Sequence, residues 1–111
     1  MTMIDSLDDQ PVLRCPDAGL EPLTLEDALE LVGDAFSAGV RTVIVPARRL
    51  PSEFFVLRTG FAGEFVHTFA KYHLRLVVSG DVARQLAASP TFASFVREAN
   101  RGPQLAFVDA V

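Results

Sequence analysis

The chain has 111 residues, half of them hydrophobic, and a formal net charge of −4. A single domain of this length buries enough apolar surface for a packed core, so general disorder is excluded. The ten basic residues are scattered along the chain, and no apolar run approaches the roughly 20 residues that span a bilayer. We therefore expect neither a nucleic-acid nor a membrane partner.

The single cysteine, Cys15, has no second thiol with which to form an internal disulfide, and the first ten residues hold no apolar run typical of a secretory signal. Both features favour a reducing cytoplasm, where we predict that the Cys15 thiol is unreactive. His67 and His73 are six residues apart and would lie on different faces of a helix, so no metal site is predicted. No dinucleotide or phosphate-loop signature occurs, and we expect no cofactor.

The N-terminal part, residues 1–23, is predicted to be an arm that carries one short edge strand. Residues 1–10 show little pattern. The run from Pro11 to Cys15 suits a strand at the edge of a sheet, because proline is tolerated there. Residues 24–111 are predicted to form the α/β domain.

The first helix is predicted between Thr24 and Gly39. Thr24, followed by Asp27 three residues later, is a variant of the capping box, and Gly39 suits the left-handed position that closes a helix. The apolar residues that recur at helical spacing are Leu25, Ala28, Leu29, Val32, Ala35 and Phe36. We expect them to face the core.

Three strands are predicted in the domain, at residues 41–46, 74–79 and 104–108. The first holds Val43-Ile44-Val45, a continuous apolar run typical of a strand that is covered on both faces. The second is also nearly apolar throughout.

A long phenylalanine-rich helix is predicted after Pro51, with Ser52 as its cap. Its apolar stripe consists of Phe54, Leu57, Phe61, Phe65, Phe69 and Tyr72. Two glycines, Gly60 and Gly63, interrupt it. An interior glycine costs about 1 kcal/mol relative to alanine, so we expect a reason for both, with close packing favoured over a break in the helix.

The last helical region follows Ser79-Gly80-Asp81, and Ser89-Pro90 predicts a second helix start within it. Strands and helices therefore alternate, and such crossovers imply right-handed parallel connections. The predicted fold class is α/β: a single small domain with a mostly parallel four-stranded sheet and covering helices. Whether the helices cover one face or both stays open.

Three segments carry a family resemblance: ALELVGDAFSAGVRTVIVPARRL, FFVLRTGFAGEFVHTFAKYHLRLVVSGD and FVREANRGPQLAFV. The most specific elements are Leu57–Gly60 with Ala62–Glu64, Gly80-Asp81, and Glu98 with Asn100–Gly102. Over about residues 24–108 the chain resembles the bacterial family of the domain of unknown function 4180. This resemblance implies a small cytoplasmic α/β domain without an assigned activity or cofactor.

The element order also resembles that of STAS domains of the anti-sigma-factor-antagonist type, which act by binding protein partners. Those domains typically carry an Asp at the end of the strand before the second helix, and a phosphorylatable Ser at the start of that helix. Here Pro46 stands in place of the Asp, and Ser52 matches the Ser only loosely. The resemblance implies a STAS-like fold and does not extend to a phosphorylation switch.

Arg58, Thr59, Gly60 and Gly63 form the first candidate ligand site. If the helix breaks near Gly60, backbone N–H groups at a new helix N-terminus, with Arg58 beside them, would suit a phosphate or a carboxylate. The spacing is not that of a Walker loop.

Asp81 and Asn100 extend this candidate site. Asp81 lies just past the carboxyl end of an apolar strand, where open α/β sheets bind ligands, although a helix cap is the simpler interpretation. Arg58, Glu64 and Glu98 are candidates for buried ion pairs, and solvated salt bridges are the alternative.

The adjacent residues Phe54 and Phe55 cannot both face one core, so together with Phe61 they are candidate interface residues of a homodimer. We predict a non-enzymatic regulatory or protein-interaction module whose partner is another protein or a second copy of the chain. The alternative is a small-ligand-binding protein, or a minor enzyme, with its site at the carboxyl ends of the strands.

Overall fold

The computed structural model of the chain describes residues 3–7, 10–16 and 21–109. The strands are β1 (Met3–Leu7), β2 (Gln10–Arg14), β3 (Thr42–Pro46), β4 (Arg75–Ser79) and β5 (Leu105–Val108). The α-helices are α1 (Leu25–Ala38), α2 (Phe61–Ala70), α3 (Ala83–Ala88) and α4 (Pro90–Ala99). Three short 3₁₀ turns lie between β3 and α2: η1 (Ala47–Arg49), η2 (Ser52–Phe55) and η3 (Leu57–Thr59).

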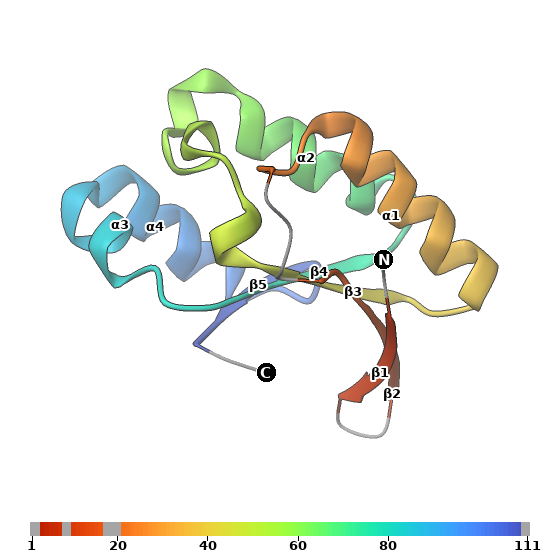
Figure 1. Cartoon of the computed structure of the whole chain (residues 1–111). Coiled ribbons are helices and arrows are strands. Elements are labelled where there is room, and N and C mark those ends of the chain that lie inside the picture. The colour runs from red at the N-terminus through yellow and green to blue at the C-terminus, as the bar shows by residue number, and fades with distance from the viewer. Residues whose placement is uncertain (1–2, 8–9, 17–20, 110–111) are drawn as a thin grey trace.

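The strands form one sheet in the order β1–β2–β3–β4–β5 (Figure 1). Strands β2 to β5 run parallel, which confirms the predicted α/β class and its parallel four-stranded sheet. Strand β1 pairs antiparallel with β2. The prediction of a loose arm over residues 1–10 is therefore wrong for Met3–Leu7, while residues 1–2 and 8–9 lie outside the described part. Strand β2 is an interior strand and not the predicted edge.

The helices of the described chain pack on one face of the sheet (Figure 1). Each right-handed crossover leads to the next strand in order, so successive helices fall on the same side. Their buried side chains join one core with strand residues such as Val43 and Leu76. The opposite face holds a smaller buried cluster of Val12, Ile44 and Val77. Strand β3 is thus buried on both faces, as its apolar run predicts.

Helix α1 begins and ends as predicted. The Thr24 hydroxyl accepts a hydrogen bond from the Asp27 amide at 3.1 Å, and the Asp27 carboxylate accepts one from the Thr24 amide at 2.8 Å. Gly39 follows the helix with a φ of 71°. Leu29 and Phe36 contradict the prediction, because they are 51% and 57% exposed. They lie at the flank of the apolar face and not at its centre.

The prediction of one long phenylalanine-rich helix after Pro51 is wrong for the residues before Phe61. The chain makes the turns η2 and η3 instead, and α2 begins after Gly60, whose φ is 82°. Glycine takes this left-handed conformation without steric cost, so the chain turns there and a new helix starts. Ser52 lies inside η2, which has no side-chain cap. The apolar stripe survives the break, since Phe54, Phe65 and Phe69 are fully buried.

The predicted second start in the last helical region is confirmed. The Ser89 hydroxyl accepts a hydrogen bond from the Phe92 amide at 3.1 Å, and Pro90 is the first residue of α4. In the described part of the chain, no helix is long and apolar enough to cross a membrane.

Candidate functional site

The segment predicted to bind an anion does form a helix N-terminus. Arg58, Thr59, Gly60 and Gly63 are all exposed there. The Thr59 hydroxyl is occupied by the backbone, because it accepts a hydrogen bond from the Phe61 amide at 3.3 Å and lies 2.8 Å from two backbone carbonyl oxygens. The hydroxyl therefore serves the turn before α2.

Close packing does not explain the two glycines of this segment. A Cβ atom added at Gly60 or at Gly63 would meet no other group within 4 Å. Gly60 is accounted for by its positive φ, whereas Gly63 faces open space. The interpretation that both glycines permit the approach of a neighbour is wrong.

Asp81 and Asn100 each hold backbone in place through a side-chain oxygen. Asp81 follows the carboxyl end of β4, and its Oδ1 accepts a hydrogen bond from the Ala83 amide at 2.9 Å, where α3 begins. Asn100 lies in the connection before β5, and its Oδ1 accepts a hydrogen bond from the amide of Phe107, the third residue of that strand, at 2.7 Å. A side-chain oxygen of each residue thus binds backbone.

The predicted buried ion pairs are wrong. Arg58, Glu64 and Glu98 are all exposed. Glu98 instead pairs with Arg101 at 3.4 Å, and both of these side chains are 73% exposed. An ion pair exposed to water at the end of a helix contributes little to stability.

The candidate interface phenylalanines belong to the core. Phe54 is fully buried, which contradicts its prediction as an interface residue. Phe55 is half-buried with its ring centroid 5.3 Å from that of Phe92, and half-buried Phe61 stacks on Phe65 at 5.7 Å. The 3₁₀ turns allow the adjacent Phe54 and Phe55 to contact the same core, which a continuous helix would not.

An exposed apolar cluster lies elsewhere, on the helical layer. Phe36 of α1 and Tyr72, just after α2, make an edge-to-face contact with ring centroids 5.7 Å apart. Leu29 lies two turns before Phe36 on the same flank of α1. We call these three residues the α1–α2 ridge. The helical spacing of the sequence groups all three with the core, because it does not separate the flank of an apolar face from its centre.

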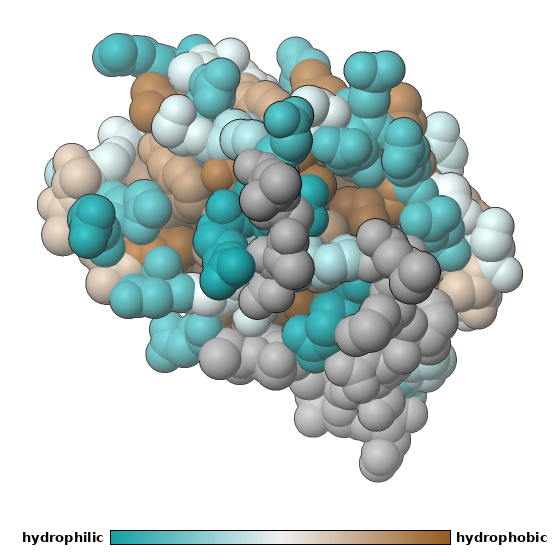
Figure 2. Space-filling view, in the orientation of Figure 1, coloured by the Kyte–Doolittle hydropathy of each residue, from teal (hydrophilic) through white to brown (hydrophobic). Residues whose placement is uncertain are grey.

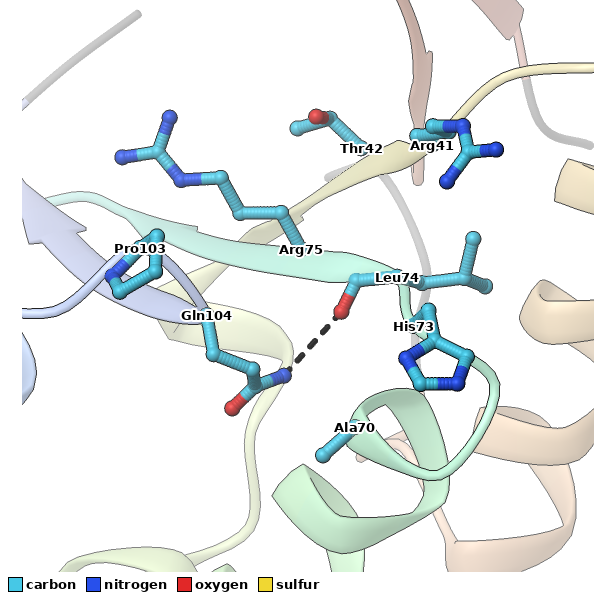
Figure 3. A pocket seen from close by; sticks show the side chains of 8 residues that line it. All are labelled: Arg41, Thr42, Ala70, His73, Leu74, Arg75, Pro103 and Gln104. Atoms are coloured by element: carbon cyan, nitrogen blue, oxygen red, sulfur yellow. Dashed lines mark hydrogen bonds between the residues drawn. The ribbon is translucent and has the colours of Figure 1, made fainter.

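A hollow of about 300 Å³ opens at the amino-terminal edge of the sheet (Figure 3). Its lining includes Arg41, Thr42, Ala70, His73, Arg75 and Gln104. These residues come from the starts of three strands and from the end of α2. The sequence predicts a site at the carboxyl edge, where ligands usually bind in such sheets, and carries no motif that indicates this hollow.

The sequence model of one family, the domain of unknown function DUF4180, matches residues 7–111. The chain belongs to this family. No curated protein and no solved structure matches the chain significantly. The resemblance expected from the sequence is thus confirmed, and its extent is greater than residues 24–108.

Cys15 carries the single thiol of this DUF4180 chain. It is buried, and burial raises the pKa of its thiol, although the Arg49 guanidinium at 3.8 Å acts in the opposite direction. A raised thiol pKa leaves less thiolate at neutral pH, so the prediction of an unreactive thiol agrees with its surroundings. Arg49 donates a hydrogen bond to the Pro16 carbonyl at 2.7 Å and one to the Glu21 carbonyl at 3.3 Å.

Proposed function

We propose that this chain is a non-enzymatic interaction module that pairs with a second copy of itself through the α1–α2 ridge. The observation that carries the proposal is the Phe36–Tyr72 contact, in which the two rings are 57% and 40% exposed. Exposed aromatic residues that already contact each other present a large, rigid apolar surface at little cost in conformational entropy.

The exposure of large apolar side chains is concentrated on this ridge. Four large hydrophobic residues of the described chain are strongly exposed, and three of them are Leu29, Phe36 and Tyr72. The fourth, Val56, lies between the turns η2 and η3. Figure 2 shows one face of the molecule, on which hydrophobic areas are interrupted by hydrophilic residues.

The charges beside the ridge suit a second copy of the chain. Glu26 and Glu30 are exposed on α1, and Lys71 is exposed at the end of α2, with its Nζ atom 5.5 Å from the centroid of the Tyr72 ring. In a two-fold dimer the same surface occurs on both copies, so acidic α1 of one copy faces the basic end of α2 of the other, twice. A surface that carries both signs is complementary to itself.

The element order that resembles STAS domains, which act through protein partners, supports the same role. We place the module in the cytoplasm, on the support of its single buried thiol. A second candidate function, small-ligand binding, is favoured by a different observation, the cationic hollow at the amino-terminal edge.

The test is the oligomeric state of the full chain, measured by sedimentation equilibrium and by native mass spectrometry over a range of concentrations. We expect a dimer that Phe36→Glu converts to a monomer, because the new carboxylates would be buried against apolar rings. Val56→Glu is the matched control, since it places the same charge on an exposed apolar position outside the ridge, and it should remain dimeric.

Both variants should keep the helical content of the parent chain and, at concentrations low enough for the parent to be monomeric, its urea midpoint, because the replaced side chains are exposed. A parent chain that stays monomeric at every concentration would overturn the proposal. So would equal dissociation by Phe36→Glu and Val56→Glu.

A further inference from the structure

We propose that the hollow at the amino-terminal edge binds an oxyanion, a phosphate or carboxylate group carried by a small molecule. The site shares no lining residue with the ridge or with the helix N-terminus at Gly60, the first candidate ligand site of the sequence. It is assembled where the α1–β3, α2–β4 and α4–β5 connections meet.

Backbone hydrogen bonds fix the three strand starts relative to one another. The Arg75 amide donates to the Arg41 carbonyl at 2.7 Å, and the Leu76 amide donates to the Gln104 carbonyl at 2.9 Å. The Gln104 side-chain amide donates to the Leu74 carbonyl at 3.1 Å (Figure 3). The frame of the hollow is therefore rigid before any ligand enters.

The described residues of the lining carry charge of one sign. Among them Arg41, His73 and Arg75 are titratable and none is Asp or Glu, although the chain as a whole carries −4. Within the described residues, the side chains of these three make no hydrogen bond or ion pair. Guanidinium groups without a partner are ready to bind an oxyanion, to which they can donate two parallel hydrogen bonds.

The close view shows how these groups are distributed. In Figure 3 the guanidinium groups of Arg41 and Arg75 lie on the side of β4 away from Ala70 of α2, and Thr42 lies between them. His73 and Gln104 lie on the side of Ala70. Both arginines are exposed, so their long side chains can turn toward an ion near the Thr42 hydroxyl.

The size of the hollow points to a small molecule and not to a bare ion. About 300 Å³ is at the lower end of the volumes of ligand pockets. This volume holds an anionic group together with the remainder of a small molecule. The backbone at His73 supports this assignment. Among the described non-glycine residues, His73 has a positive φ, 60°. Glycine is favoured at such a position, so the histidine side chain calls for a reason.

The test is a two-dimensional NMR titration of the full chain with sodium phosphate, and separately with sodium acetate, at constant ionic strength set with sodium chloride. We expect saturable shifts of amide signals at residues 41–42, 73–75 and 104. Arg41→Gln and Arg75→Gln should each weaken the affinity about tenfold, since each removes a charge-assisted hydrogen-bond donor.

Arg58→Gln is the matched control, because it removes an exposed arginine beside the helix N-terminus at Gly60, the other candidate anion site. It should leave the titration unchanged. Saturation by phosphate alone would assign a phosphate ligand, and saturation by acetate as well would extend the site to carboxylates. Shifts centred on residues 58–63, shifts that sodium chloride reproduces, or equal affinities in the parent, Arg41→Gln and Arg75→Gln chains would overturn the proposal.

Discussion

The α1–β3 and α2–β4 connections end their helices with the same pattern of backbone hydrogen bonds and differ in the residue at the left-handed position. In each, the amide of one residue donates to the carbonyl three positions back, at 3.1 Å after α1 and 2.9 Å after α2. The next amide donates to the carbonyl five positions back, at 3.0 Å in both. This is the Schellman closure of a helix, and its left-handed position is Gly39 in one connection and His73 in the other. An arginine of the hollow follows two residues later, Arg41 or Arg75.

The difference shows what each connection contributes. Gly39 adopts its φ of 71° without strain, so the α1 connection is built for stability. His73 adopts a similar φ of 60° with a side chain that disfavours it, and its ring lines the hollow. The α2 connection is thus less stable with His73 than it would be with glycine, and the histidine places an imidazole ring at the candidate ligand site.

The largest expected effect comes from placing a β-branched side chain at Gly39, in the α1–β3 connection. Gly39→Val should lower the free energy of unfolding by about 2 kcal/mol, because a β-branched residue is strained at positive φ. Urea denaturation followed by circular dichroism measures this loss.

Gly33→Ala is the control on the same helix. Gly33 lies inside α1 without a positive φ, and an added Cβ would meet nothing within 4 Å. This variant should raise the free energy of unfolding by about 0.5–1 kcal/mol through helix propensity alone. Equal losses in both variants would show that any side chain in this region is harmful, and the argument from φ would fail.

A smaller effect is expected in the third connection, α4–β5, which ends its helix in another way. Asn100 has a right-handed conformation, and its side chain bonds the Phe107 amide of the edge strand β5. Asn100→Ala leaves this amide without its acceptor and should cost about 1.5 kcal/mol in urea denaturation. Asn100→Asp keeps an acceptor oxygen and should retain most of the stability. If both variants lose the same amount, the hydrogen bond is not the cause.

Much of the fold could be predicted because its signals are local. The capping box of α1, the Ser89-Pro90 start of α4 and the apolar run of β3 each specify an element within a few residues. Strand β1 could not be predicted, because Met3–Leu7 lacks a strong pattern and owes its conformation to pairing with β2. The break before α2 was underestimated, since a helical stripe of phenylalanines continued across Gly60.

The candidate site was the harder part, because the hollow exists only in the assembled sheet. Arg41, His73 and Gln104 are far apart in sequence and belong to no motif, and parallel strand register brings them together. Asp81 and Asn100 did fit a familiar expectation, a polar residue near a strand end. Each proved to bind backbone, which is the commoner use of such residues.

The smallest expected effect is that of replacing His73, in the α2–β4 connection. His73→Gly relieves the strain of a left-handed side chain, and the greater freedom of glycine in the unfolded chain offsets part of this gain. We expect the free energy of unfolding to rise by about 0.5 kcal/mol, with the helix closure intact. His73→Asn is the matched control, since asparagine tolerates the same backbone conformation without an imidazole ring. Both variants should weaken the response to phosphate in the NMR titration, because both remove the ring from the hollow while Arg41 and Arg75 remain. If both bind phosphate as the parent chain does, His73 has no part in the site, and its conformation is a cost without a function.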